Sequence, residues 1–207
     1  MPRTTRQRML DSAVRLFREH GYNGTGFRDV VAHSNSPRGS IYHHFPGGKA
    51  QLGVEAVESS GRFINGLIEQ GVEGEDFVVG FERFWRWWIR FIEADDFQAG
   101  CPVVGVAVEA HPEAPQLADA ASRVFSDWER TVAISLRKAG VAREEEALGL
   151  ATLILGALEG STVLARAAGN REPLVRTGKQ LASLLRNRLQ QTSSKTKRGR
   201  GVNQERS

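Results

Sequence analysis

The segment from Arg38 to His44 carries the side chains of this sequence that are best suited to contact a polyanion. Within these seven residues an arginine, a serine, a tyrosine and two histidines supply hydrogen-bond donors, acceptors and flat rings. Gly39 removes one side chain, so the backbone there can approach a surface closely. A short rigid helix with this composition fits the major groove of DNA, which is wide enough to admit it.

Side-chain chemistry assigns different contacts to these residues. Tyr42 and Lys49 suit phosphate oxygens, whereas Arg38 and its polar neighbours suit base edges. Thr25 and Arg28 begin a preceding helix and would lie near the DNA backbone that this helix crosses. The full set of predicted DNA-binding residues is Thr25, Arg28, Ser36, Pro37, Arg38, Gly39, Ser40, Tyr42, His43, His44 and Lys49.

Other interpretations of the same residues are weaker. Tyr42, His43 and His44 taken alone also fit a packed aromatic cluster. Adjacent histidines point about 100° apart on a helix, so they form a poor metal pair, and no carboxylate or cysteine spacing nearby completes a zinc site. Residues 47–49 read Gly-Gly-Lys but lack the rest of a phosphate-binding loop. We therefore predict no metal site and no cofactor.

Three short helices must position the segment. The first is predicted from Arg3 to His20, with an apolar stripe and Thr4 as its cap. The second begins at Thr25, a capping residue, and ends near residues 34–35. The third has Ser36 as its cap and Pro37 in its first position, and it runs to Phe45. Ile41 and Phe45 must pack inward on the first two helices.

The remainder of the chain also has helical patterning, which predicts an all-α protein of about nine helices. Valine-rich residues 101–110 have strand propensity, but Pro102 suits a first helical turn and no partner strand appears, so we assign a short helix. The predicted divisions are a helix-turn-helix domain at 1–48, a helical ligand-binding and dimerisation domain at 49–191, and a basic tail, expected to be disordered, at 192–207.

Charge is distributed unevenly along the chain. Residues 1–50 hold eight Lys and Arg against three Asp and Glu, residues 51–185 hold thirteen against twenty, and residues 186–207 hold seven against one. Such a basic head and tail indicate that only part of the chain faces a polyanion. The N-terminus shows no secretory signal, no run of 18 apolar residues indicates a membrane span, and the single cysteine excludes an internal disulfide. We expect a cytoplasmic protein.

Residues 6–52 resemble the DNA-binding domain of TetR-family transcriptional regulators. Two positions depart from the family pattern. Gly26 replaces the serine, threonine or valine that is common after Thr25, and Asn35 stands where glycine is usual, although asparagine tolerates left-handed geometry. Motifs further along resemble the LmrA/YxaF-like branch. The matching stretches include Gly21-Tyr22-Asn23-Gly24-Thr25, Ser36-Pro37-Arg38-Gly39-Ser40-Ile41-Tyr42-His43-His44-Phe45, Phe45-Pro46-Gly47-Gly48-Lys49, Gly100-Cys101-Pro102-Val103 and Leu158-Glu159-Gly160.

The resemblance implies an all-helical homodimer that reads a palindromic operator and releases it when a small effector binds the C-terminal domain. Leucines on the last two helices suit the dimer interface, and aromatic walls with a few polar groups suit a flat hydrophobic effector. We therefore predict a ligand-responsive transcriptional regulator and expect it to be a repressor. The predicted effector-binding residues are Phe84, Trp88, Phe91, Cys101, Val104, Val108, Phe125, Trp128 and Glu159.

Two alternatives remain at this stage. One is a DNA-binding regulator without a small effector, controlled by a protein partner. The other is a helical enzyme that uses His111, Glu109 and Cys101. The enzyme is disfavoured because Cys101 lies among apolar residues without a nearby Lys or Arg to activate its thiolate.

Overall fold

The chain is helical throughout the parts whose structure is described, namely residues 3–72, 76–109 and 114–204 of a computed structural model. At residue 72 and residues 192–204 only the backbone is described. The predicted all-α class is confirmed. The helices are α1 Thr5–His20, α2 Phe27–His33, α3 Ser40–His44, α4 Gly48–Val72, α5 Phe77–Glu93, α6 Pro102–Glu109, α7 Pro115–Lys138, α8 Glu144–Ala168 and α9 Glu172–Gln204.

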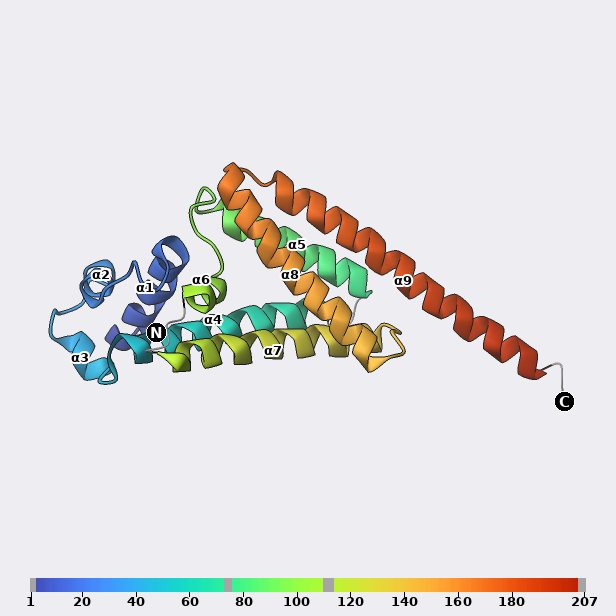
Figure 1. Cartoon of the computed structure of the whole chain (residues 1–207), viewed down its shortest axis with the longest axis horizontal. Coiled ribbons are helices and arrows are strands. Elements are labelled where there is room, and N and C mark those ends of the chain that lie inside the picture. Colours follow the sequence, from blue (N-terminus) through green and yellow to red (C-terminus); the bar gives the residue numbers. More distant parts are fainter. Residues whose placement is uncertain (1–2, 73–75, 110–113, 205–207) are drawn as a thin grey trace.

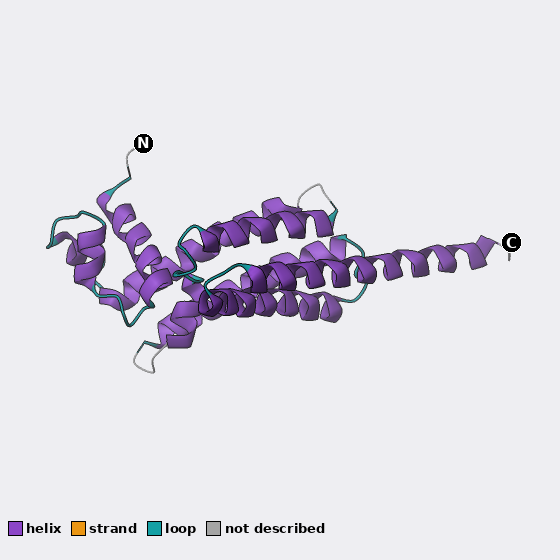
Figure 2. Ribbon diagram, turned by 90° about the horizontal axis from the view of Figure 1, so that it is seen from above, coloured by secondary structure: helices purple, strands orange, loops and turns teal. Residues whose placement is uncertain are grey.

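The helices form a small head and a longer body. Figure 1 shows α1, α2 and α3 gathered at one end, the long helices α4, α5, α7 and α8 in the body, and α6 between α1 and α4. The N-terminus lies near the head, and α9 carries the C-terminus away from it. Figure 2 shows α9 continuing past the end of the body. The head is therefore joined to the body through α1, α4 and α6.

The sequence determines α1 locally. The Thr4 hydroxyl accepts the Gln7 backbone N–H at 3.2 Å, which caps the helix as predicted. The Gln7 side chain does not complete a capping box, because it donates to Asp11 Oδ1 at 2.8 Å. The apolar stripe is buried through Leu10 and Phe17, and the helix ends at a glycine with a φ of 75°.

The starts of α2 and α3 differ from the predicted ones. Gly26, not Thr25, is the N-cap of α2, and its N–H donates to Asp29 Oδ2 at 2.7 Å. α3 begins at Ser40 instead of Pro37, because the Ser40 N–H and hydroxyl both donate to the Pro37 carbonyl at 3.0 and 2.7 Å and form a turn there. Asn35 adopts a φ of 48°, the left-handed turn geometry expected of it.

Three buried tryptophans tie the body helices together. Trp85 donates its indole N–H to the Leu174 carbonyl at 2.9 Å and so joins α5 to α9. Trp88 donates to Thr162 Oγ1 at 2.9 Å and joins α5 to α8. Trp128 donates to the Gly61 carbonyl at 3.0 Å and joins α7 to α4. Each indole ring is buried between helices and has its N–H hydrogen-bonded, and together these contacts fix the relative positions of the helices.

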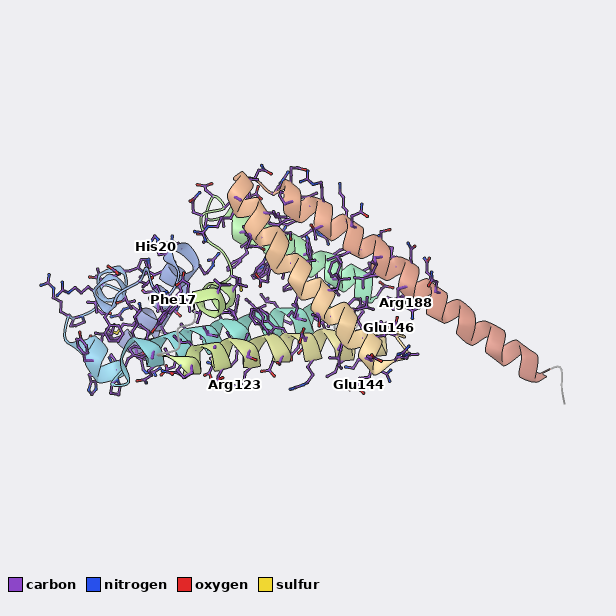
Figure 3. All side chains as sticks on the ribbon, in the orientation of Figure 1. Phe17, His20, Arg123, Glu144, Glu146 and Arg188 are labelled. Carbon is purple, nitrogen blue, oxygen red and sulfur yellow. The ribbon has the colours of Figure 1, made fainter. Side chains whose placement is uncertain are left out.

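The two C-terminal helices pack on each other but leave apolar surface uncovered. Glu146 on α8 accepts a hydrogen bond from Arg188 on α9, and Figure 3 labels both near the end of the body. α8 is long and apolar enough to cross a membrane by length and composition, a test that a core helix also passes. Residues 192–207 are expected from the sequence to be a disordered tail, whereas α9 continues as a helix to Gln204.

Candidate nucleic-acid interface and effector site

α3 presents a polar surface because two apolar side chains anchor its opposite face. Ile41 is 1% exposed and Phe45 is fully buried, as the sequence predicts. On the outer side Tyr42 is 67% exposed, and Arg38 and His43 are exposed as well. A helix held in this way can offer its outer side chains to a groove without unfolding its own packing.

The structure brings the predicted DNA-binding residues to the end of the molecule formed by α2, α3 and the start of α4 (Figure 1). Thr25 is the exception in exposure: it is 2% exposed, and its hydroxyl donates to the Gly21 carbonyl at 2.9 Å. The exposed members are Arg28, Pro37, Arg38, Gly39, Tyr42 and His43, and the half-buried members are Ser36, Ser40, His44 and Lys49.

Tyr42 is supported by a ring from the preceding helix. The Phe27 and Tyr42 rings meet edge to face, with centroids 5.4 Å apart and an interplanar angle of 72°. Such pairs stabilise beyond their burial and restrict ring orientation. Phe27 therefore fixes the direction of a side chain that remains mostly exposed.

Lys49 is held back from the surface. Its ammonium lies 4.3 Å from the centroid of the Tyr22 ring, a cation–π contact. Burial lowers the pKa of Lys49, and the carboxylates of Glu109 and Asp29 oppose that shift. A phosphate contact by Lys49 requires the side chain to leave the Tyr22 ring.

Arg18 joins the head to the body through four contacts, and sequence reasoning missed it. Its side chain is 10% exposed, and its Nη2 lies 2.9 Å from Asp95 Oδ2. The guanidinium carbon lies 3.8 Å from the centroid of Phe91, and Nε donates to the Gly100 carbonyl at 3.1 Å. The Gly100 N–H donates in return to the Arg18 carbonyl at 2.9 Å. Burial lowers the pKa of Arg18 more strongly than Asp95 raises it.

Glu109 at the end of α6 forms a second junction. Its Oε2 accepts the Asn23 backbone N–H at 2.7 Å, in the loop between α1 and α2. Gly21 has a φ of 75°, which favours glycine, and a Cβ there would lie 2.0 Å from Glu109 Oε1 and push this carboxylate away. Glu109 thus joins the end of α6 to the head.

The nine predicted effector residues differ widely in burial, and the two cavities described for this structure contain one of them each. Trp88 and Trp128 are core residues with satisfied indole donors, and Val108 is 76% exposed. A small cavity of about 30 Å³ includes Phe84, and a groove of about 350 Å³ includes Phe91. Phe125 packs edge to face on Trp128 with centroids 5.6 Å apart, and Val104 is half-buried.

Cys101 and Glu159 do come together, and they form a polar pair inside the body. The Cys101 thiol hydrogen-bonds the Glu159 carboxyl group, while Glu159 Oε1 is buried and makes no hydrogen bond. Burial raises the pKa of Glu159 to about 7 and the pKa of Cys101 well above its ordinary value. A carboxyl group with an unused acceptor in apolar surroundings is a natural anchor for a bound molecule.

The raised pKa of Glu159 predicts how stability depends on pH. The folded state holds the Glu159 proton up to pH of about 7, whereas an unfolded glutamate releases it near 4.3, so stability falls as pH rises between these values. We expect Glu159→Gln to remove that fall and to be more stable than the natural protein at pH 8, by on the order of 2 kcal/mol. Urea unfolding at pH 5 and pH 8 gives the free energy of unfolding of both proteins. An equal change in this free energy between the two pH values for the natural protein and for Glu159→Gln would contradict the assignment.

Comparison with known proteins identifies the fold and both parts of the chain. The family model for "Bacterial regulatory proteins, tetR family" matches residues 9–56, and the model "Transcriptional regulator LmrA/YxaF-like, C-terminal domain" matches residues 78–180. An HTH-type transcriptional regulator of Mycobacterium tuberculosis is 38% identical over 186 residues, covering 87% of this chain and 93% of that protein. LmrA, an HTH-type transcriptional regulator of Bacillus subtilis, is 32% identical over 184 residues, covering 88% and 97%.

The chain belongs to the TetR family of bacterial transcriptional regulators. Among solved structures, the TetR-family regulator CifR in complex with a 26-base-pair operator DNA superposes with a TM-score of 0.72 at 23% identity, covering 88% of this chain and 98% of that one. This likeness confirms the fold.

Family membership decides between the classes left open by the sequence. This TetR-family protein is a DNA-binding transcriptional regulator, because the proteins that it matches along most of its length are regulators and not enzymes. Of the residues considered for an enzyme, Glu109 is the clamp on the head and Cys101 is buried, while His111 lies outside the described residues. No cluster of three or more metal-binding side chains occurs in the described ranges.

Proposed function

We propose that this TetR-family regulator binds a palindromic operator as a homodimer and acts as a repressor that a small hydrophobic or aromatic effector releases. The observation that carries the proposal is the outer face of α3, whose polar side chains are exposed while Ile41 and Phe45 anchor the helix. The operator complex of CifR supports the same use of the helix-turn-helix here. DNA binding in turn places the protein in the cytoplasm.

The dimer is proposed to form through α8 and α9. One face of α8 is exposed although it consists of apolar side chains and glycines. Leu164 on this face is 59% exposed and Val163 is 58% exposed. The three glycines of this face have nothing within 4 Å of a built Cβ, so another helix can approach closely. We call this face the α8 stripe; its residues are Gly149, Leu153, Gly156, Gly160, Val163 and Leu164.

A two-fold dimer explains how one short helix achieves specificity. Each α3 reads only a few base pairs, and two copies double the contact set when they enter successive major grooves about 34–36 Å apart. An effector that prefers a different spacing lowers operator affinity; a 100-fold preference corresponds to about 2.7 kcal/mol. An effector that binds both arrangements equally would release nothing.

The proposed effector site lies in the body, around the polar pair Cys101 and Glu159. Cys101 belongs to the same hydrophobic core as Trp88 of α5, and Phe84 and Phe125 pack against that core. Apolar walls with a few polar groups are typical of small-molecule sites. The effector must displace side chains to enter, because the indole groups of the core are already packed and hydrogen-bonded.

Arg38 is expected to read a base directly. Arg38→Ala should cost about 1–3 kcal/mol of operator affinity and relax the preference at one base position, because an arginine that contacts guanine discriminates by that amount. Competition binding with single-base operator variants measures it. Tyr42→Phe serves as the contrast, since loss of a phosphate contact weakens all variants equally. An unchanged base preference in Arg38→Ala would show that Arg38 reads no base.

The alternative is a regulator controlled by a protein partner without a small effector. A thermal-shift screen with aromatic compounds and lipophilic cations separates the two functions. The proposed function expects at least one compound that raises the melting temperature and weakens operator binding. A broad panel that does neither would favour the partner-controlled regulator.

A further inference from the structure

A groove between the head and the body is built from helices of both parts. It measures about 350 Å³ and lies where α1 faces α4 and the end of α5. This volume falls within the range of small-molecule sites. Its lining residues are Asp11, Val14, Arg15 and Arg18 from α1, Ser59, Ser60, Phe63 and Ile64 from α4, and Phe91, Asp95 and Pro102 from beyond them.

Polar side chains line this groove, and one of them has an unused hydroxyl group. Ser60 Oγ is buried and makes no hydrogen bond, which is uncommon in native proteins and needs an explanation. Asp11 Oδ2 and Arg18 Nη2 are held by ion pairs, since Arg3 lies 2.7 Å from Asp11 and Asp95 lies 2.9 Å from Arg18.

The donors in the groove have more unmet capacity than the acceptors. Asp11 is already served by Arg3 at 2.7 Å and by Gln7, which donates to its Oδ1 at 2.8 Å. Arg18 has five N–H donors, of which one is used on the Gly100 carbonyl and one faces Asp95 at 2.9 Å, so N–H groups remain for a further acceptor. The Ser60 hydroxyl on the facing helix donates to nothing. A guanidinium and a hydroxyl aimed into one groove match a carboxylate oxygen pair.

The remaining walls are apolar and partly aromatic. Phe91 lies beneath the Arg18 guanidinium and is half-buried, while Phe63 is 58% exposed in spite of its size. Val14, Ile64 and Pro102 complete the apolar lining. A flat hydrocarbon body that covers Phe63 would remove this ring from water.

We propose that the groove is a binding site for a small aromatic monocarboxylate, whose acid group pairs with Arg18 and Ser60 and whose ring packs on Phe63 and Phe91. The site goes beyond the effector site proposed above, because it joins the head to the body. A molecule bound there ties α1 to α4 and resists any change in their relative position. Only its influence on operator affinity rests on the proposed function.

The test is calorimetric titration of the full-length protein with 2-naphthoate, without DNA. We expect one site per protomer with a Kd below about 1 mM, and binding at least about tenfold weaker for 2-naphthamide, which keeps the ring and lacks the charge. Failure of 2-naphthoate to bind, or equal binding of the amide, would overturn the proposal.

Variants locate the site without disturbing Arg18, whose loss endangers the fold. Ser60→Val removes the hydroxyl and Phe63→Ala removes an exposed ring, and each should weaken 2-naphthoate by about tenfold or more with unchanged thermal unfolding. Ser122→Val, on an exposed position of α7, makes the same change as Ser60→Val and should have no effect. Unaltered binding by both groove variants would place the ligand elsewhere and refute the assignment. Operator binding of the ligand-free variants reports separately on the proposed function.

Discussion

Gly156→Glu is expected to abolish operator binding while each protomer stays folded. Gly156 is exposed on the α8 stripe, and a Cβ built there meets nothing within 4 Å, so the protomer accommodates a side chain. Replacing a mid-helix glycine should even stabilise the helix, by about 0.5–1 kcal/mol. In the proposed dimer the same side chain places two charges in a close helix–helix contact, and an unpaired buried charge costs several kcal/mol. We expect operator affinity to fall by at least about 100-fold.

Light scattering measures whether the protein is a dimer, and electrophoretic mobility shifts measure its affinity for the operator. The matched control is Gly66→Glu on α4, where a built Cβ also meets nothing within 4 Å but the position lies outside the α8 stripe. That variant should remain a dimer and bind the operator normally. A Gly156→Glu protein that remains dimeric and binds tightly would show that the protomers meet through another surface.

Trp88→Ala is expected to lower the free energy of unfolding by several kcal/mol. Trp88 is fully buried, and its indole N–H donates to Thr162 Oγ1 at 2.9 Å between α5 and α8. Removing a buried aromatic side chain typically costs about 3–5 kcal/mol, because burial is lost and a cavity remains. The Thr162 hydroxyl also loses its donor. Urea unfolding followed by circular dichroism measures the change.

The neighbouring tryptophan supplies a matched control for this prediction. Trp87 is half-buried and immediately precedes Trp88 in α5; its ring packs on neighbouring aromatic rings while part of it remains in water. Trp87→Ala removes the same atoms and should cost less than half as much. Equal losses at the two positions would indicate that Trp88 does not occupy the core in the way described.

The helices and the outer face of α3 could be predicted because they depend on neighbours in the sequence. The spacing of apolar residues in α1 places Leu10 and Phe17 on its buried face, and Thr4 caps this helix. Ile41 and Phe45 anchor α3 in the same way, through contacts within the first part of the chain. The errors at helix starts came from competing local hydrogen bonds. Pro37 allows a helix start, but the Ser40 donors close a turn on its carbonyl instead.

The interior of the body could not be predicted in the same way. An aromatic residue on an apolar helix face suits a pocket wall and a core position equally, and only the partner helix decides between them. Trp88 and Trp128 became core residues because Thr162 and the Gly61 carbonyl accept from their indole groups. Val108 points out of the core, whereas Cys101 and Glu159 meet although 58 residues separate them in the chain.

By itself the sequence determined that this protein is helical, that its first part is a helix-turn-helix, and which side chains of α3 face outward. These properties arise from contacts between residues a few positions apart. Only the tertiary structure decided that Arg18 and Glu109 join the head to the body and that a groove opens between α1 and α4. Burial and unused hydrogen-bonding capacity depend on residues brought together from distant parts of the chain, and no local pattern records them.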